Sequence, residues 1–553
     1  MFRSHKWVLV LVPLLILSAC KPKPPEVVVE PPTMPADTGG TWWNDRVFYE
    51  VFVRSFQDSR AGPLSGDGKG DLQGLIERLD YLNDGDPKTT DDLGITGLWL
   101  MPIAESPSYH GYDVLDYYTV EKDYGDNETF KQLMDEAHRR GIVVIVDLVI
   151  NHTSSDHPWF ADAARDAQSP YRDWYVWSNE KLTYQGPWGQ QVWYGRGNVW
   201  YYAIFWEGMP DLNYRTPAVT AEIYDVTRFW LVEMGADGFR MDAIRHLIED
   251  GQVQENTPET HQWLADYHQF FKSVNPNALT VGEVWTRSED VVPYVGDKLD
   301  ICFEFDLAAV ILEGARTGST MTLPSMVKKV DKLYPPQQYA TFLTNHDQNR
   351  AMSQLNGDAG KAKLAAAIYL TLPGVPFIYY GEEIGLTGVK PDENLRTPMQ
   401  WNGDAYAGFT TGFPWYPVNA DYSTKNVTAQ LADPDSLLNY YKTLIRLRSA
   451  FAALRTGQLG EVVSGARTVY AYGRHGETED VLVVHNLGAE AVSEYALQMR
   501  AGPLAAGTYK VYDLLGGAWM ADLTVDENGA VEGYVPLVEL PPMTSYILLL
   551  QEK

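Results

Sequence analysis

Three acidic residues end separate apolar runs of this chain, and their types and spacing suit the cleavage of a glycosidic bond. Asp242, Glu283 and Asp347 each follow a β-prone stretch. Charge at the end of a buried strand is costly unless it is paired, so this pattern indicates a site. Glycoside hydrolysis needs one carboxylate as nucleophile and one carboxylic acid that protonates the leaving oxygen. The segments that carry these acids and their neighbours are residues 147–152 (DLVINH), 238–243 (GFRMDA), 282–285 (GEVW) and 342–347 (FLTNHD).

Basic neighbours of these acids can support the same chemistry. Arg240 precedes Asp242 by two residues, so on a strand both side chains point to one side, and the guanidinium can keep the aspartate ionised. His152 and His346 can form hydrogen bonds with sugar hydroxyls, although a lone histidine is more often structural. A metal site built from the same acids is an alternative, but no His-x-x-x-His or Asp-x-Asp pairing accompanies them.

Eight apolar runs, which alternate with helical patterns, must position these residues. Several runs are continuously apolar, as in parallel strands buried on both faces. Residues 221–235 show one helical pattern. Residues 127–141 show another, and this second segment ends in two arginines and a glycine that stops the helix. This alternation predicts an α/β fold, a (β/α)8 TIM barrel, in which function collects at the carboxyl ends of the strands. The runs are 47–56, 95–103, 142–150, 237–241, 278–284, 300–305, 339–343 and 375–380.

The chain is too long for one hydrophobic core, so we expect several domains. About 65 residues separate the third run from the next helical pattern, which predicts an inserted domain rather than a loop. From about Gly457 short alternating β runs predict a C-terminal antiparallel β-sandwich. The predicted parts are a signal peptide (1–19), a Pro-rich tether (20–41), the barrel (42–151 and 218–456), the inserted domain (152–217) and the C-terminal domain (457–553).

The first residues have the pattern of an export signal. Arg3 and Lys6 precede an apolar stretch at 8–17 that is too short to span a bilayer comfortably. It ends in Leu-Ser-Ala-Cys, which resembles a bacterial lipobox. We therefore predict a lipid anchor on Cys20 and an exported protein that is attached to a membrane of the cell envelope, on its periplasmic or extracellular face. A plain secretory signal with an incidental cysteine is the alternative.

The composition of the chain indicates which classes of ligand it can bind. The net charge of −29 argues against nucleic acid, which needs clustered Lys and Arg. The 17 Trp and 34 Tyr residues suggest flat apolar surfaces on which sugar rings stack, although a core can absorb aromatic residues too. There are two cysteines, so a lipid on Cys20 leaves Cys302 alone, without a disulfide and with buried packing as its role.

The four segments, in this order, resemble the signature regions of the α-amylase family, glycoside hydrolase family 13. The resemblance extends from Trp42 to the end of the chain. It implies Asp242 as nucleophile, Glu283 as general acid/base and Asp347 as the acid that binds substrate hydroxyls and stabilises the transition state. The sugar-contacting residues that it implies are Arg240, His152 and His346, with Tyr112 as the aromatic platform under the sugar that is cleaved.

Further motifs concern the substrate. Residues 209–213 (MPDLN) resemble the fifth signature in a form between oligo-1,6-glucosidases and neopullulanases, an intermediary subgroup that acts chiefly on starch and maltooligosaccharides. Ala243 resembles members that act on α-1,4 bonds, and Arg245 with His246 resembles the basic pair at aglycone subsites. Arg396, in the run 396–401 (RTPMQW), instead resembles α-glucosidases and trehalose-forming enzymes. The resemblance therefore predicts a retaining α-amylase-type hydrolase of α-1,4-glucans, with α-glucosidase, glucanotransferase or trehalose-forming activity as the alternative.

A non-catalytic lipoprotein that captures α-glucans is a second alternative, and the presence of all three acids argues against it. Trp285, directly after the acid/base, is the candidate for sugar stacking. The tryptophans of the inserted domain could line a glucan groove or pack the domain.

Calcium is the predicted metal. The run from Asp58 to Asp71, with Asp67 and Lys69, resembles the calcium loop of the oligoglucosidase branch, although it carries an insertion. Asn151 matches a calcium ligand of classical amylases. A Gly-rich turn without an ion is the alternative.

Overall fold

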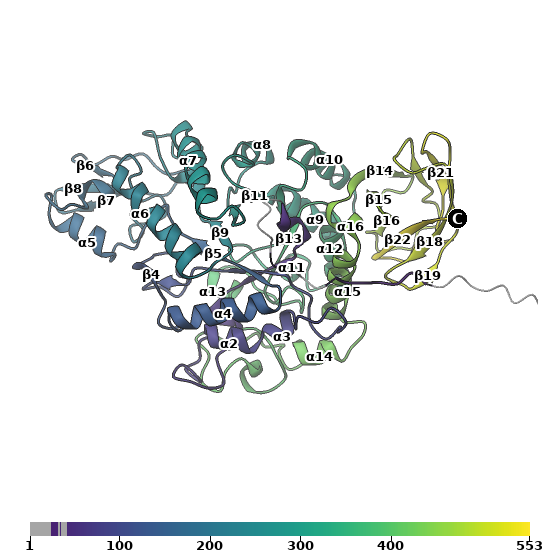
Figure 1. Ribbon diagram of the computed structural model, residues 1–553, viewed down its shortest axis with the longest axis horizontal. Coiled ribbons are helices and arrows are strands. Elements are labelled where there is room, and N and C mark those ends of the chain that lie inside the picture. Colours follow the sequence, from purple (N-terminus) through teal and green to yellow (C-terminus); the bar gives the residue numbers. More distant parts are fainter. Residues whose placement is uncertain (1–23, 31–33, 35–40) are drawn as a thin grey trace, which may run out of the picture.

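The computed structural model describes residues 24–30, 34 and 41–553, and its centre is a closed barrel of eight parallel strands. Figure 1 shows this barrel between an inserted domain at one end of the molecule and the C-terminal domain at the other. All eight predicted runs contain a barrel strand, so the predicted fold class is confirmed. The strands are β1 (Phe48–Val51), β2 (Gly97–Leu100), β5 (Val143–Leu148), β9 (Gly238–Met241), β10 (Leu279–Gly282), β11 (Ile301–Phe303), β12 (Tyr339–Thr341) and β13 (Val375–Tyr379).

The register of three neighbouring strands aligns the charged residues. Asp147 on β5 is paired with Arg240 on β9, and Met241 is paired with Gly282 on β10. The next residues along these two strands are Asp242 and Glu283, which therefore leave the barrel side by side. All residues of β5, β9 and β10 are buried, which explains why these strands are almost continuously apolar.

Helices surround the barrel. The pattern at 127–141 is confirmed as α4, which Asp126 caps at its N-terminus through the backbone N–H of Thr129. The pattern at 221–235 begins earlier than predicted, because Pro217 occupies the first turn of α6, and it ends as a short π-helix, Phe229–Glu233. The long helices are α4 (Asn127–Arg139), α6 (Pro217–Arg228), α7 (Pro258–Val274), α9 (Phe305–Thr317), α10 (Leu323–Leu333), α12 (Ala359–Thr371) and α15 (Leu437–Ala450).

Shorter helices complete the barrel and its loops. They are α1 (Val53–Phe56), α2 (Leu72–Glu77), α3 (Leu79–Leu82), α8 (Ser288–Val291), α11 (Ala351–Gln354), α13 (Asp392–Leu395), α14 (Val427–Leu431) and α16 (Ala452–Thr456). The run 47–56 thus contains both β1 and α1. A two-stranded hairpin of β3 (Ala104–Glu105) and β4 (Asp116–Val120) follows β2.

The domain inserted after the third barrel strand is a small aromatic unit. It combines α5 (Pro158–Arg165) with a three-stranded sheet of β6 (Trp177–Ser178), β8 (Val199–Tyr202) and β7 (Trp193–Arg196), in that order. Phe160 stacks on Trp177 with ring centroids 5.6 Å apart, and Tyr201 packs against both rings. Several aromatic residues of this domain therefore form its core.

The C-terminal domain is antiparallel, as predicted. Its hydrogen-bonded path runs β19–β18–β22–β16–β15–β14–β17–β21, with β20 paired to β18. It contacts α12 of the barrel, where Tyr472 Oη lies 2.6 Å from Thr371 Oγ1. The strands are β14 (Gln458–Ser464), β15 (Val469–His475), β16 (Asp480–Asn486), β17 (Leu497–Met499), β18 (Gly507–Asp513), β19 (Ala518–Trp519), β20 (Leu523–Val525), β21 (Val531–Tyr534) and β22 (Thr544–Glu552).

Two sequence predictions concern the membrane and the cysteines. Cys20, the predicted lipid site, lies outside the described residues. Within the part of the chain that the structure describes, no helix has the length and apolar character needed to cross a bilayer. Cys302 is a buried free thiol on β11, in agreement with the packing role expected of it.

Candidate active site

One fully buried guanidinium joins three carboxylates at the carboxyl ends of β5, β9 and β10. Arg240 Nη1 donates to Asp242 Oδ1 at 2.5 Å and to Asp147 Oδ1 at 2.9 Å. Arg240 Nη2 lies 2.8 Å from Glu283 Oε2, an ion pair without the alignment of a hydrogen bond. Asp242 and Glu283 are thus brought together as predicted, with one cation between them.

The two acids differ in how this cation holds them. Burial raises the pKa of Asp242, and the charge and hydrogen bond of Arg240 oppose that rise. Burial also raises the pKa of Glu283, and there Arg240 opposes the rise by charge alone, while Asp242 and Asp347 add to it. The hydrogen bond from Arg240 therefore favours the ionised form of Asp242 more directly than the ion pair favours that of Glu283. This is the division of roles that a nucleophile and a general acid require.

The turn after β9 holds Glu283 from the other side. Ala243 adopts a left-handed conformation with φ +49°, which is uncommon for a residue with a side chain. This conformation allows its backbone N–H to donate to Glu283 Oε2 at 3.2 Å. Non-glycine residues in this region persist where the surroundings over-determine them, and active sites are typical places.

Asp347 belongs to a second network at the end of β12. It lies 3.2 Å from His346 Nε2 and accepts a 2.8 Å hydrogen bond from Arg396 Nη2. Burial alone would raise the pKa of Asp347, but His346 and Arg396 hold it well below its usual range. Its side chain is 32% exposed, so an ionised carboxylate faces the open site. Arg396, predicted to bind substrate, is buried and holds Asp347.

His346 carries a positive charge inside the barrel. Its Nδ1 lies 2.6 Å from Glu50 Oε1 on β1. Burial alone would lower the pKa of His346, but Asp347 and Glu50 raise it to about 9. Its other nitrogen, Nε2, lies 2.7 Å from Tyr112 Oη, and the two rings stack with centroids 5.4 Å apart. Tyr112 is therefore fixed against His346, and its role as an aromatic platform stays a prediction.

The remaining predicted binding residues surround this centre. His152 is buried, and its Nε2 lies 3.0 Å from the carbonyl oxygen of Tyr112. Burial lowers the pKa of His152 to about 4, so the ring is neutral and positions Tyr112. Trp285 stacks on Phe305 with centroids 4.8 Å apart and remains 45% exposed, so one face is available for a sugar. Arg245 Nε donates to His246 Nε2 at 3.0 Å beyond Ala243.

Sequence reasoning did not assign a role to Asp147 or Glu50. Asp147 accepts hydrogen bonds from Arg240, from Tyr112 Oη at 3.0 Å and from Trp99 Nε1 at 3.2 Å. Burial raises the pKa of Asp147 to about 7. Both acids lie within apolar strands rather than after them, and an isolated acid inside such a strand is the signal that could have identified them.

The loop that resembles a calcium site is held by internal hydrogen bonds. The Asp58 carboxylate accepts from the backbone N–H groups of Gly66 and Gly68 at 2.8 and 3.0 Å. Asp71 caps α2 and also accepts from the backbone N–H of Ser59, while Asp67 accepts from the N–H of Lys69 at 2.8 Å. Each of these carboxylates therefore already accepts backbone hydrogen bonds, and calcium binding at this loop stays a prediction.

Lys69 forms an ion pair at the same loop. Its Nζ lies 2.8 Å from Asp123 Oδ1, and Arg54 binds the other oxygen of that carboxylate at 2.7 Å. Among the described residues, no three His, Cys, Asp or Glu side chains are grouped so that they could hold a metal. The ammonium group of Lys69 therefore pairs with Asp123, and the predicted metal contact of this residue, which would come from a backbone oxygen, stays a prediction.

Asn151 fits a cation better. Its Nδ2 donates to Asp211 Oδ2 at 3.1 Å, whereas its buried Oδ1 has no hydrogen-bond partner. Burial raises the pKa of Asp211 well above its usual range, and nearby Glu249 adds to the rise. An unpartnered amide oxygen beside a buried carboxylate suits a hard, oxygen-liganded cation. Calcium binding stays a prediction, with Asn151 and Asp211 as the residues that would hold the ion between barrel and inserted domain.

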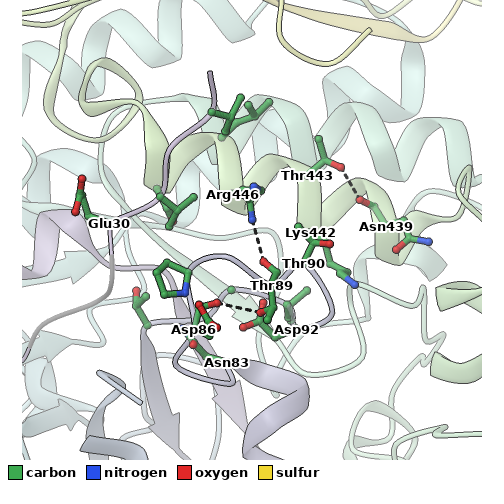
Figure 2. A pocket seen from close by; sticks show the side chains of 18 of the residues that line it. Glu30, Asn83, Asp86, Thr89, Thr90, Asp92, Asn439, Lys442, Thr443 and Arg446 are labelled. Atoms are coloured by element: carbon green, nitrogen blue, oxygen red, sulfur yellow. Dashed lines mark hydrogen bonds between the residues drawn. The ribbon is translucent and has the colours of Figure 1, made fainter. Parts of the chain in front are cut away.

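A cavity of about 950 Å³ lies at the opposite end of the barrel. It is lined by residues that precede β1 and β2, such as Arg46 and Thr96, and by Val27 and Val29 of the N-terminal segment. Figure 2 shows its polar wall, where Arg446 Nη1 donates to the carbonyl oxygen of Thr89. Function in barrels of this kind collects at the carboxyl ends of the strands, so this cavity is separate from the site described above.

Comparisons with known proteins agree with the geometry. Residues 50–457 match the family described as "Alpha amylase, catalytic domain". The chain is 40% identical over 450 residues to alpha-amylase 3 of Dictyoglomus thermophilum, which covers 81% of this chain and 85% of the relative. It is 34% identical to an oligo-1,6-glucosidase of Heyndrickxia coagulans over 534 residues (82% and 93%). It is 36% identical to a trehalose synthase/amylase of Mycobacterium tuberculosis over 517 residues (82% and 83%).

Among solved structures, an alpha-amylase from H. orenii superimposes with a TM-score of 0.79. Its sequence is 40% identical, and the match covers 92% of this chain and 99% of that one. The family match spans both parts of the barrel and the inserted domain between them. The carboxylates joined by Arg240 therefore lie within the matched region.

Proposed function

The chain belongs to the α-amylase family and is a glycoside hydrolase, and we propose that it cleaves α-1,4-glucosidic bonds of starch and maltooligosaccharides with retention of configuration. The observation that carries this proposal is that Arg240 donates a hydrogen bond to Asp242 but forms only an ion pair with Glu283. We infer that Asp242 is the ionised acid and Glu283 the protonated one, which is the division that retaining cleavage requires. Ala243 and the intermediary form of residues 209–213 support α-1,4 bonds.

The proposed reaction has two steps. Asp242 attacks the anomeric carbon while Glu283 donates its proton to the leaving oxygen, which yields a covalent glycosyl-enzyme and a free chain end. Glu283, now ionised, then removes a proton from water, whose oxygen displaces Asp242. Asp347 stays ionised beside His346 and Arg396, so it can bind the hydroxyls of the distorted sugar and stabilise developing positive charge.

A glucosidase or transferring enzyme is the second candidate. The relatives named oligo-1,6-glucosidase and trehalose synthase/amylase favour it, as does the run 396–401. Such an enzyme would use the same nucleophile, and in the transferring case a sugar rather than water would intercept the intermediate. Incubation with maltotriose separates hydrolysis, which gives only shorter products, from transfer, which gives longer ones as well. Incubation with maltose detects isomerisation, because trehalose contains the same two glucose units.

The experiment that tests the assignment uses end-blocked and free maltooligosaccharides with the variants Asp242→Asn and Glu283→Gln. We expect wild type to release products with α configuration, as proton NMR of fresh product reports. Both variants should lose hydrolysis by at least about 10³-fold and retain glucan binding. An unchanged rate in both variants contradicts the proposed roles of nucleophile and general acid, and cleavage of blocked substrates reports endo action.

We also propose that the protein is exported and anchored by lipid on Cys20, where the lipobox-like run supports this placement. Metabolic labelling with a radioactive fatty acid tests it in a bacterial host that processes lipoproteins. Label in wild type that is lost in Cys20→Ala is the expected result. Secretion of unlabelled wild-type protein instead indicates a plain signal peptide.

A further inference from the structure

The inserted domain carries an exposed indole beside the active-site histidines. Trp188 is 55% exposed, whereas Trp174 and Trp193 of the same domain are buried. The ring of Trp188 stacks on Phe205, with centroids 5.7 Å apart and an angle of 26° between the planes. It also packs edge-on against His246, with centroids 5.4 Å apart. The indole is thus supported by two rings and still presents much of its surface to solvent.

Phe205 links this indole to the catalytic centre. Its ring lies 5.2 Å from that of His152 and 6.2 Å from that of His246, measured between centroids. His152 in turn contacts the backbone of Tyr112, the residue stacked on His346. A series of ring contacts and one hydrogen bond therefore extends from the catalytic centre to Trp188.

The turn that carries Trp188 is held by its own hydrogen bonds. Gln185 and Gln191 form an antiparallel bridge at its base. The backbone N–H of Trp188 donates to Gln190 Oε1 at 2.9 Å, and Gln190 Nε2 donates to the carbonyl oxygen of Ile204 at 2.8 Å. The position of the indole is therefore set before any ligand arrives, which reduces the entropy cost of binding.

The same turn is tied to the barrel beside the general acid. Gln254 Nε2 donates to the carbonyl oxygen of Gln185 at 3.0 Å, and His246 Nδ1 lies 2.9 Å from the carbonyl oxygen of Gln254. Burial lowers the pKa of His246 to about 3, so the ring is neutral. Arginine only donates, so the contact from Arg245 Nε makes Nε2 the acceptor and Nδ1 the donor.

The contacts of the Trp188 turn with Gln254 and His246 indicate which part of a substrate would reach the indole. Residues 243–246 follow the nucleophile, and Ala243 binds Glu283, the acid that protonates the leaving oxygen. Asp347 belongs to the other network, with His346 and Arg396. Trp188 contacts His246 directly, whereas it reaches Tyr112 only through Phe205 and His152, so the indole is joined more directly to the turn that binds the general acid, on the side of the leaving sugar.

We propose that Trp188 is a specificity-determining residue whose free face stacks on a glucose ring of the leaving chain. This inference rests on the proposed function and deepens it, because it identifies what recognises the part of the α-glucan beyond the bond that is cleaved. Aromatic side chains suit the apolar faces of pyranose rings, and a pre-positioned indole favours longer substrates over short ones.

The test compares Trp188→Ala and Trp188→Phe with wild type on maltooligosaccharides of three to seven units. Trp206→Ala is the matched control, since Trp206 is also an exposed indole of the inserted domain, 49% exposed, whose ring lies against Gly208. We expect Trp188→Ala to raise KM for the longer substrates about five- to tenfold, with kcat little changed. Trp188→Phe should recover most of this loss, and Trp206→Ala should match wild type.

A binding measurement supplies an independent readout. In the Asp242→Asn background, maltoheptaose should quench tryptophan fluorescence, and the added Trp188→Ala change should remove most of that quenching. Wild type that fails to cleave maltooligosaccharides overturns the proposed function and this inference together. Two results overturn this inference alone when wild type does cleave them. One is that Trp188→Ala leaves KM unchanged for every chain length, and the other is that Trp206→Ala raises KM as much as Trp188→Ala does.

Discussion

Glu50 Oε1 lies 2.6 Å from Nδ1 of His346, and both side chains are almost completely shielded from solvent. The pair connects β1 with the loop after β12, two elements far apart in the chain. Asp347 and this contact with Glu50 together give His346 a charge that burial alone would remove. That charge in turn keeps Asp347 ionised at the open face of the site.

Replacing Glu50 with glutamine should therefore change the pH profile of the enzyme. Loss of the carboxylate lowers the pKa of His346 from about 9, so the imidazolium loses its proton earlier as pH rises. We expect kcat/KM on maltotriose to fall about tenfold relative to wild type at pH 8 and to change little near pH 5. Glu304→Gln is the control, because Glu304 is also buried but binds Tyr334 and Ser288 outside the site. A uniform loss at every pH would indicate a purely structural role.

The single cation shared by three carboxylates leads to a second prediction. In Arg240→Lys the charge remains, but one ammonium group cannot reproduce the geometry of a guanidinium that contacts Asp147, Asp242 and Glu283. We expect kcat to fall by about 10²- to 10³-fold and the acid limb of kcat/KM to move to higher pH, because Asp242 loses part of the interaction that opposes its raised pKa. Steady-state kinetics across pH, beside circular dichroism as a check on folding, measures both effects. An unmoved acid limb argues against Arg240 as the group that keeps Asp242 ionised.

We expect calcium to bind at Asn151 and Asp211. We expect added Ca²⁺ to raise the Tm of chelator-treated wild type by a few degrees, since binding to the folded state stabilises it. Asp211→Asn should abolish that response, whereas Asp67→Asn, in the loop closed by its own hydrogen bonds, should keep it. Differential scanning calorimetry with a chelator, and then with excess Ca²⁺, distinguishes the two places. A response lost only in Asp67→Asn would instead restore the loop as the metal site.

A buried acid away from the site should make stability depend on pH. Glu382 Oε1 accepts hydrogen bonds from Tyr369 and Tyr441 at 2.9 and 2.8 Å, and its Oε2 has no partner. Burial raises the pKa of Glu382 to about 8, well above its value in the unfolded chain. Its contribution to stability is therefore complete below about pH 4 and is lost as pH rises toward 8.

Glu382→Gln should remove this dependence, because glutamine does not titrate. The free energy of unfolding of the variant relative to wild type should increase from pH 5 to pH 8, by up to about 1 kcal/mol for each pH unit. Chemical denaturation at a series of pH values gives this difference directly. A difference that stays constant with pH would mean that Glu382 titrates at its ordinary value in the folded protein.

Local patterns were sufficient for the eight strands and for the acids that follow them. Asp242, Glu283 and Asp347 stand where apolar runs end, so each is visible without knowledge of its neighbours. The start of α6 was placed too late because its first turn, at Pro217, precedes the apolar periodicity. Asp147 and Glu50 remained unassigned, since their importance depends on partners on other strands.

The exposure of aromatic residues likewise cannot be predicted from local sequence patterns. The sequence contains many tryptophans in the inserted domain, but their types and spacing do not separate Trp193, which is buried in that domain, from Trp188, which is exposed beside His246. Likewise, the glycine-rich loop at 58–71 has the composition of a calcium site, whereas its backbone N–H groups occupy the carboxylate of Asp58. Hydrogen-bond partners of this kind are set by the path of the folded chain.

The sequence by itself determined the barrel and the three acids, because strand periodicity and charge at strand ends are local properties of the chain. Only the tertiary structure decided which carboxylate receives the hydrogen bond of Arg240, which histidine is charged and which tryptophan is exposed beside His246. The physical reason is that pKa and exposure depend on neighbours in space. Arg240 reaches Asp147 across 93 positions of the chain, and Glu50 reaches His346 across 296.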